Sequence, residues 1–128
     1  MKIEYTKIVK DHFYNPRNVG EIKNANGIGT VGSKTCGDVM TIYLRIEKKI
    51  IKDISFKTYG CAAAIASGSI ATEIAKGMKI QDAMNLTRED IAKKLGGLPE
   101  FKMHCSNLAA DAIHKAIKDY TKKIKRVI

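Results

Sequence analysis

The chain has 128 residues, of which 45% are hydrophobic and 28% charged, a composition typical of a globular protein with a buried core. This length predicts one domain over residues 1–128. The first residues lack the apolar run of a signal peptide and no stretch is long enough to span a bilayer, so we expect neither secretion nor membrane insertion.

A formal net charge of +10 raises the question of a nucleic-acid partner. The 23 lysines and arginines are spread along the whole chain, and the densest group closes the last predicted helix, where the helix dipole favours cations. No basic segment is interleaved with aromatic residues that stack on bases. We expect no nucleic-acid partner, and a solvated basic surface or an acidic protein partner fits the charge better.

The N-terminal part predicts a helix and then a loop. From Tyr5 to Phe13 apolar residues recur at helical spacing, and the helix should stop at Asn15, because a proline follows it. Residues 20–33 are polar and rich in glycine, which indicates an irregular or mobile connection. Within that stretch, residues 27–32 match the pattern G-x-G-x-x-G. A dinucleotide fingerprint must follow a buried strand and open a helix, so we interpret these glycines as loop flexibility.

The middle of the chain predicts an antiparallel hairpin. Residues 39–47 alternate between apolar and polar side chains, the pattern of a half-buried strand. Residues 51–59 form a second strand with Ile54 and Phe56 on its buried face, and Lys48-Lys49 is a plausible turn between them. A third strand is expected near residues 30–34.

Helices dominate the second half of the chain. One is predicted over residues 62–76, with Gly77 as its C-cap, and another from the capped start at Thr87 to Gly96. A long amphipathic helix should begin at about Ser106 and bury one apolar stripe. The predicted fold class is therefore α+β, with helices packed on a small antiparallel sheet.

Three cysteines, Cys36, Cys61 and Cys105, carry the strongest chemical signal. None forms a C-x-x-C pair, so the fold must bring any shared site together from three segments. An odd number of cysteines without a secretory signal favours a cytoplasmic protein with thiols or metal thiolates.

The predicted position of each cysteine supports a role as a ligand rather than as a small buried hydrophobe. Cys36 lies in a turn, where Gly37 leaves the backbone free to bring Asp38 back toward the same site. Cys61 and Cys105 lie at helix starts, where the dipole favours the thiolate form.

Thiolates select zinc, Cu(I) or iron–sulfur clusters. Zinc modules usually pair their cysteines at short spacing, which is absent here. Three cysteines with one harder ligand, Asp38 or His104, suit a cluster whose fourth corner opens easily. A zinc-binding interaction module is the alternative. We interpret His12 and His114 as structural, and a protease-like dyad of His104 with Cys105 as unfavourable, because sequence neighbours rarely aim their side chains together.

Several linked motifs resemble those of the IscU/NifU-N iron–sulfur cluster assembly scaffold family, in its stand-alone form. They are Cys36-Gly37-Asp38-Val39-Met40, Phe56-Lys57-Thr58-Tyr59-Gly60-Cys61, Ala64-Ile65-Ala66-Ser67, His104-Cys105-Ser106, Asn15-Pro16-Arg17-Asn18-Val19-Gly20 and Asp111-Ala112-Ile113. Together they cover nearly the whole chain.

The resemblance implies an α/β sandwich with a three-stranded antiparallel sheet and cysteines that converge at one exposed end. It implies a scaffold rather than an enzyme, which takes persulfide sulfur from a cysteine desulfurase, adds iron, builds a transient [2Fe–2S] cluster and passes it to acceptor proteins. A homodimer in the cluster-bound state and zinc in the cluster-free state are also implied.

The same resemblance assigns roles to residues. Cys36, Cys61 and Cys105 would hold the cluster or persulfide, Asp38 would be a ligand or keep the cluster labile, and His104 is the alternative fourth ligand. The family does not settle which cysteine accepts sulfur first.

Lys102 would assist sulfur or metal exchange. It closes the segment Leu98-Pro99-Glu100-Phe101-Lys102, which stands where the family has Leu-Pro-Pro-Val-Lys, a sequence read by an Hsp70-type chaperone. The changes to Glu100 and Phe101 make dependence on that chaperone doubtful.

Overall fold

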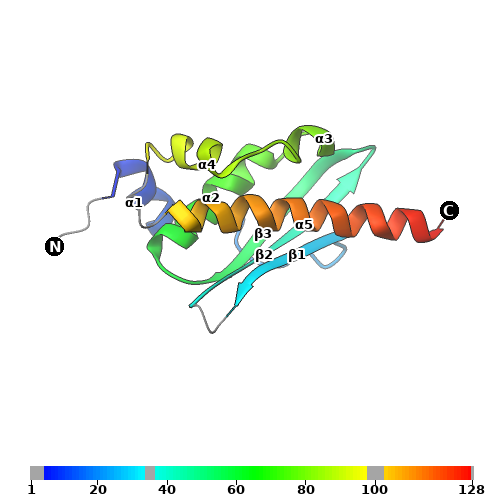
Figure 1. The fold of residues 1–128 in the computed structure, drawn as a ribbon, viewed down its shortest axis with the longest axis horizontal. Coiled ribbons are helices and arrows are strands. Elements are labelled where there is room, and N and C mark those ends of the chain that lie inside the picture. Colours follow the sequence, from blue (N-terminus) through cyan, green and yellow to red (C-terminus); the bar gives the residue numbers. More distant parts are fainter. Residues whose placement is uncertain (1–4, 34–36, 98–102, 128) are drawn as a thin grey trace.

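The computed structural model describes residues 5–33, 37–97 and 103–127, and of residues 33, 103–106 and 125–127 it describes the backbone alone. The elements in chain order are α1 (Lys7–Tyr14), β1 (Gly27–Ser33), β2 (Asp38–Glu47), β3 (Ile50–Tyr59), α2 (Ala62–Ala75), α3 (Ile80–Ala83), α4 (Arg88–Lys94) and α5 (Met103–Val127). The three strands form one antiparallel sheet in the order β1-β2-β3. The predicted α+β class is confirmed, including the three-stranded sheet and the long C-terminal helix (Figure 1).

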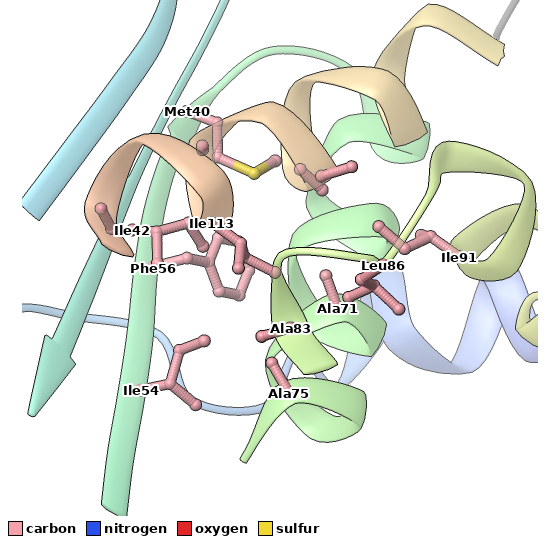
Figure 2. Packing of buried hydrophobic residues seen from close by; sticks show 14 of the residues in the cluster. Met40, Ile42, Ile54, Phe56, Ala71, Ala75, Ala83, Leu86, Ile91 and Ile113 are labelled. Atoms are coloured by element: carbon pink, nitrogen blue, oxygen red, sulfur yellow. The ribbon is translucent and has the colours of Figure 1, made fainter. Parts of the chain in front are cut away.

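Helices α2 and α5 cover one face of the sheet. Helix α5 packs on β1 and β2, α2 packs on β3, and α1 and α4 lie against the helices (Figure 1). Along β2, buried and half-buried side chains alternate as predicted. The buried ones, on the face that the helices cover, are Met40, Ile42, Leu44 and Ile46. Phe56 of β3 lies at the centre of the core, among side chains from α2 and α5 (Figure 2).

The β2–β3 hairpin has the predicted turn at Lys48 and Lys49. Both residues have positive φ, 53° and 64°, which is the backbone of a tight hairpin turn without its usual Asn-Gly pair. The strand register places Val39 opposite Tyr59, so the start of β2 and the end of β3 lie at the same end of the sheet.

The prediction of an irregular segment over residues 20–33 is wrong for its last part, because β1 begins at Gly27 and not near Thr30. The glycines serve close packing: a Cβ at Gly27 would lie 2.6 Å from the carbonyl oxygen of Ala116 in α5, and a Cβ at Gly29 would lie 2.6 Å from that of Ala112. Glycine therefore lets the helix backbone approach the strand. The segment continues into a second strand and not a helix, which agrees with the rejection of a dinucleotide site.

Side chains from α5 also satisfy backbone groups of β1. The Ile28 N–H donates to Asp119 Oδ2 at 2.9 Å, and Lys115 Nζ donates to the Thr30 carbonyl at 3.0 Å. Since β1 is an edge strand, these contacts occupy backbone groups that would otherwise be exposed.

The helix predictions differ from the structure at their ends. The capping box at Thr87 and Asp90 is confirmed by reciprocal hydrogen bonds of 3.2 and 3.0 Å. The short helix α3 was not predicted. Helix α5 begins at Met103 and not at Ser106, which places Cys105 inside its first turn. No helix in the described part of the chain is long and apolar enough to cross a membrane.

Candidate metal centre at one end of the sheet

The described part of the predicted site is formed where β2 begins and β3 ends. Asp38 is the first residue of β2 and is half-buried, and Cys61 follows β3 by two residues. Gly37 has φ of +83°, a conformation that other residues rarely adopt, so the predicted need for glycine here is confirmed. Cys36 and Lys102 lie outside the described residues.

The Asp38 side chain lies against Gly60, the residue before Cys61. A Cβ built on Gly60 would be 2.5 Å from Asp38 Oδ1 and 3.5 Å from its Cγ. The carboxylate therefore occupies the space that a side chain at position 60 would need. Asp38 therefore lies beside the segment of Cys61, although the two residues are 23 positions apart in the sequence.

Cys61 is the N-cap residue of α2. Its backbone is extended, with φ −82° and ψ 178°, and its carbonyl accepts hydrogen bonds from the amides of Ala64 at 3.0 Å and Ile65 at 3.1 Å. Its side chain makes no capping hydrogen bond, is half-buried and packs against the buried pair Ala63 and Ala64. Cys61 thus lies at the N-terminal end of α2, the positive pole of the helix dipole.

Helix α5 runs antiparallel to β1, and this direction brings its start toward the same end of the molecule. Gly27 faces Ala116 and Tyr120, whereas Gly29 faces Ala112 and Ala116, so later residues of β1 meet earlier turns of α5. The first turn of α5 carries His104 and Cys105. In Figure 1 this turn and the loop from β3 to α2 lie at the left of the view, whereas β1 ends nearer the middle, below them.

His12 and His114, which we interpret from the sequence as structural, lie in two different environments. His12 is buried between α1 and α2, where its Nδ1 and Ser69 Oγ are hydrogen-bonded at 2.7 Å. Burial, together with the charge of Arg17, lowers the pKa of His12 below its usual value of 6.5. His114 is half-buried on α5, and its Nε2 has no hydrogen-bond partner among the residues that the structure describes.

The Asp38 carboxylate lies against Gly60, the residue before Cys61, and a thiolate and a carboxylate are the donor types of a soft metal site with one harder ligand. Within the described side chains there is no group of three or more His, Cys, Asp or Glu residues able to hold an ion. Cys36 and the side chains of His104 and Cys105 lie outside the part that this statement covers. The sequence did not identify Gly60 as a residue of the site, although its position beside Cys61 was the available signal.

The chain is thus an α+β protein with a cysteine and an aspartate at one end of its sheet. The profile of the family described as "NifU-like N terminal domain" matches residues 4–127. The chain belongs to this family, as the sequence motifs predicted.

Named relatives and a solved structure agree. The chain is 59% identical over 119 residues to "Iron-sulfur cluster assembly scaffold protein IscU 1" of Archaeoglobus fulgidus, covering 93% of this chain and 78% of that protein. It is 52% identical over 129 residues to "Iron-sulfur cluster assembly scaffold protein IscU" of Aquifex aeolicus, covering 99% and 82%. The N-terminal part of a NifU-like protein from Brucella abortus shares the fold, with a TM-score of 0.71 at 23% identity over 92% of this chain and 94% of that one.

Proposed function

We propose that this protein is a scaffold on which an iron–sulfur cluster is assembled and from which it is passed to acceptor proteins, without catalytic turnover of its own. The observation that carries the proposal is the contact of the Asp38 carboxylate with Gly60, next to Cys61, in a chain of the NifU-like N terminal domain family. A hard carboxylate beside a soft thiol suits a site that must first hold iron and sulfide and then release them.

In this proposal Cys36, Cys61 and Cys105 bind the cluster, and either Asp38 or His104 supplies the fourth position. The cargo is a transient [2Fe–2S] cluster, and zinc occupies the site when no cluster is present. The carboxylate is the weaker ligand for iron that thiolates already hold, so it keeps one corner open to exchange. Lys102 assists sulfur or metal exchange.

Sulfur arrives from a cysteine desulfurase. A scaffold thiolate attacks the outer sulfur of the donor's persulfide, a new S–S bond forms on the scaffold, and the donor cysteine leaves as thiolate. Two electrons from a thiol or an electron-carrier protein then release this sulfur as sulfide, which combines with iron. Any of the three cysteines is a candidate first acceptor.

The other partners follow from the same proposal. We propose a cytoplasmic protein that forms a homodimer when loaded, binds no nucleic acid, and depends little on an Hsp70-type chaperone, because Glu100 and Phe101 replace the residues that such a chaperone reads.

The decisive experiment is anaerobic reconstitution with ferrous iron, cysteine, a cysteine desulfurase and a thiol reductant, followed by visible absorption and by iron and sulfide analysis. We expect a chromophore with sulfur-to-iron charge-transfer bands. Replacing Cys36, Cys61 or Cys105 by serine should weaken it, whereas Asp38→Ala should lengthen its lifetime.

Two outcomes would contradict the proposal. A wild-type protein that stays colourless with no bound sulfide is not a scaffold. A protein that binds one zinc tightly under all conditions and unfolds on chelation is instead a zinc-stabilised module.

A further inference from the structure

Gly60 differs from the other glycines of the site in what surrounds it. A Cβ at this position would be 2.5 Å from Asp38 Oδ1 and 3.0 Å from the Cβ of Ala64. A Cβ atom does not come closer than about 3 Å to a neighbouring heavy atom, because repulsion rises steeply below that separation. Any side chain at position 60 must therefore displace the carboxylate of Asp38.

The backbone itself does not require glycine here. Gly60 is not among the glycines with positive φ, so an alanine can adopt its conformation without strain. Gly37 shows the opposite case, since its φ is +83° and no described atom lies within 4 Å of a Cβ built on it. Of the two glycines that neighbour Cys36 and Cys61, one is needed for its backbone and the other for the space it leaves.

We propose that Gly60 is a positioning residue. Because it has no side chain, it leaves a space beside the Cys61 segment, called the seat below, that holds the Asp38 carboxylate. The inference rests on the proposed function, because it assigns a cause to the placement of the weak ligand of that site. Ligands hold a metal only when neighbouring groups fix their orientation, and a displacement of about 1 Å is enough to change binding.

The substitution that tests this is Gly60→Ala. It fills the seat and drives the carboxylate toward solvent, while Asp38 itself stays in the sequence. We therefore expect Gly60→Ala to reproduce the effects of Asp38→Ala at the metal site.

The first readout is independent of cluster assembly. Anaerobic titration with Co²⁺ gives thiolate charge-transfer bands and ligand-field bands whose position and intensity report the ligand set. Gly60→Ala and Asp38→Ala should give the same altered ligand-field bands, while the thiolate bands stay as in the wild type. A wild-type cobalt spectrum in Gly60→Ala overturns the inference.

The second readout is the lifetime of the reconstituted cluster in a double-mutant cycle. Asp38→Ala should lengthen the half-life severalfold, and Gly60→Ala should lengthen it by a comparable factor. The double variant should match Asp38→Ala alone, because once the carboxylate is removed the seat has nothing to hold. Factors that multiply in the double variant would show that Gly60 acts by another route, and the inference would then be wrong.

The Asp38→Ala background is the matched control, because the contact of the new methyl group with Ala64 is present with and without the carboxylate. Should Gly60→Ala alone fail to fold, thermal melting of the double variant decides. A melting temperature restored by Asp38→Ala supports the contact with the carboxylate as the cause, whereas a double variant that also fails to fold contradicts it.

Failure of the inference is separable from failure of the proposed function. A wild-type protein that binds no Co²⁺ and builds no cluster overturns the proposed function. A wild-type protein that does both, with Gly60→Ala indistinguishable from it, overturns the positioning role alone.

Discussion

The contact between β1 and α5 and the cysteine-bearing end of the sheet both depend on glycine, but they differ in what occupies the freed space. At Gly27 and Gly29 the occupant is the backbone of α5. At Gly60 it is mainly the carboxylate of Asp38, a half-buried side chain at the start of a strand. A helix backbone fixed by its own hydrogen bonds cannot move aside, whereas a carboxylate can rotate into water. The same residue type thus supports stability in one region and the geometry of a site in the other.

The largest effect is expected for Gly29→Ala. The new Cβ would lie 2.6 Å from the carbonyl oxygen of Ala112 and 2.9 Å from the carbonyl carbon of Lys115, so strand and helix must separate. Overpacking of this kind costs about 3 kcal/mol of unfolding free energy, and the core between β1 and α5 loses contact area with it. Urea denaturation followed by circular dichroism measures the loss.

Gly60→Ala is the matched control for that measurement, since it makes the same chemical change against a movable neighbour. Its cost should stay below about 1 kcal/mol, the usual range for changes outside a rigid core. Equal losses for the two variants would show that the distinction between backbone and side-chain neighbours does not hold.

The sequence predicts most of the elements that have a periodic or capping signal. The alternation in β2 and the Thr87–Asp90 capping box are read directly from residue types. The sequence predicts β1 only from about Thr30, because glycine has little strand propensity. Pairing with β2 and packing under α5 make residues 27–29 part of the strand.

The residues of the candidate site also differ in whether a local sequence signal predicts their position. The position of Cys61 between a strand and a helix follows from local composition and is confirmed as the N-cap of α2. The contact of Asp38 with Gly60 depends on the register that pairs Val39 with Tyr59, and no local pattern of residues encodes a register. The roles assigned to Cys36, Cys105, His104 and Lys102 remain predictions.

The contact between α1 and α2 differs from both of these regions, because it buries a group that can take up a proton. His12 lies against α2, the helix that begins at Cys61, and burial lowers its pKa. Protonation is therefore harder in the folded than in the unfolded protein, so stability is lost as the pH falls below about 6.5, the unfolded value.

The variant His12→Asn keeps a polar group near Ser69 and does not titrate. We expect the unfolding free energy of the wild type to decline more steeply between about pH 7 and pH 5 than that of the variant, with a smaller overall effect than Gly29→Ala. Chemical denaturation at several pH values gives both slopes. Parallel slopes would mean that the charge on His12 is accommodated without loosening α1 from α2.

The smallest effect is expected at the polar margin of the β1–α5 contact, where Asp119 accepts the Ile28 N–H and lies 3.0 Å from Lys123 Nζ. Partial burial raises the pKa of Asp119, but the hydrogen bond from Ile28 and the charge of Lys123 outweigh it, so the pKa lies below its usual value of 3.8. A carboxyl group whose pKa is lower in the folded than in the unfolded protein stabilises the fold above its unfolded pKa. This contribution is lost as the pH falls through the folded pKa.

Asp119→Asn keeps an oxygen for the Ile28 amide and removes the charge. Because the carboxylate is partly exposed, its loss should cost about 0.5 kcal/mol at neutral pH, with the difference shrinking near about pH 3 and in high salt. Urea denaturation of both proteins under these three conditions tests the prediction. A cost that approaches that of Gly29→Ala at neutral pH and vanishes in acid and in high salt would place the strength of the contact in its charged margin, and not in the glycines beneath the helix.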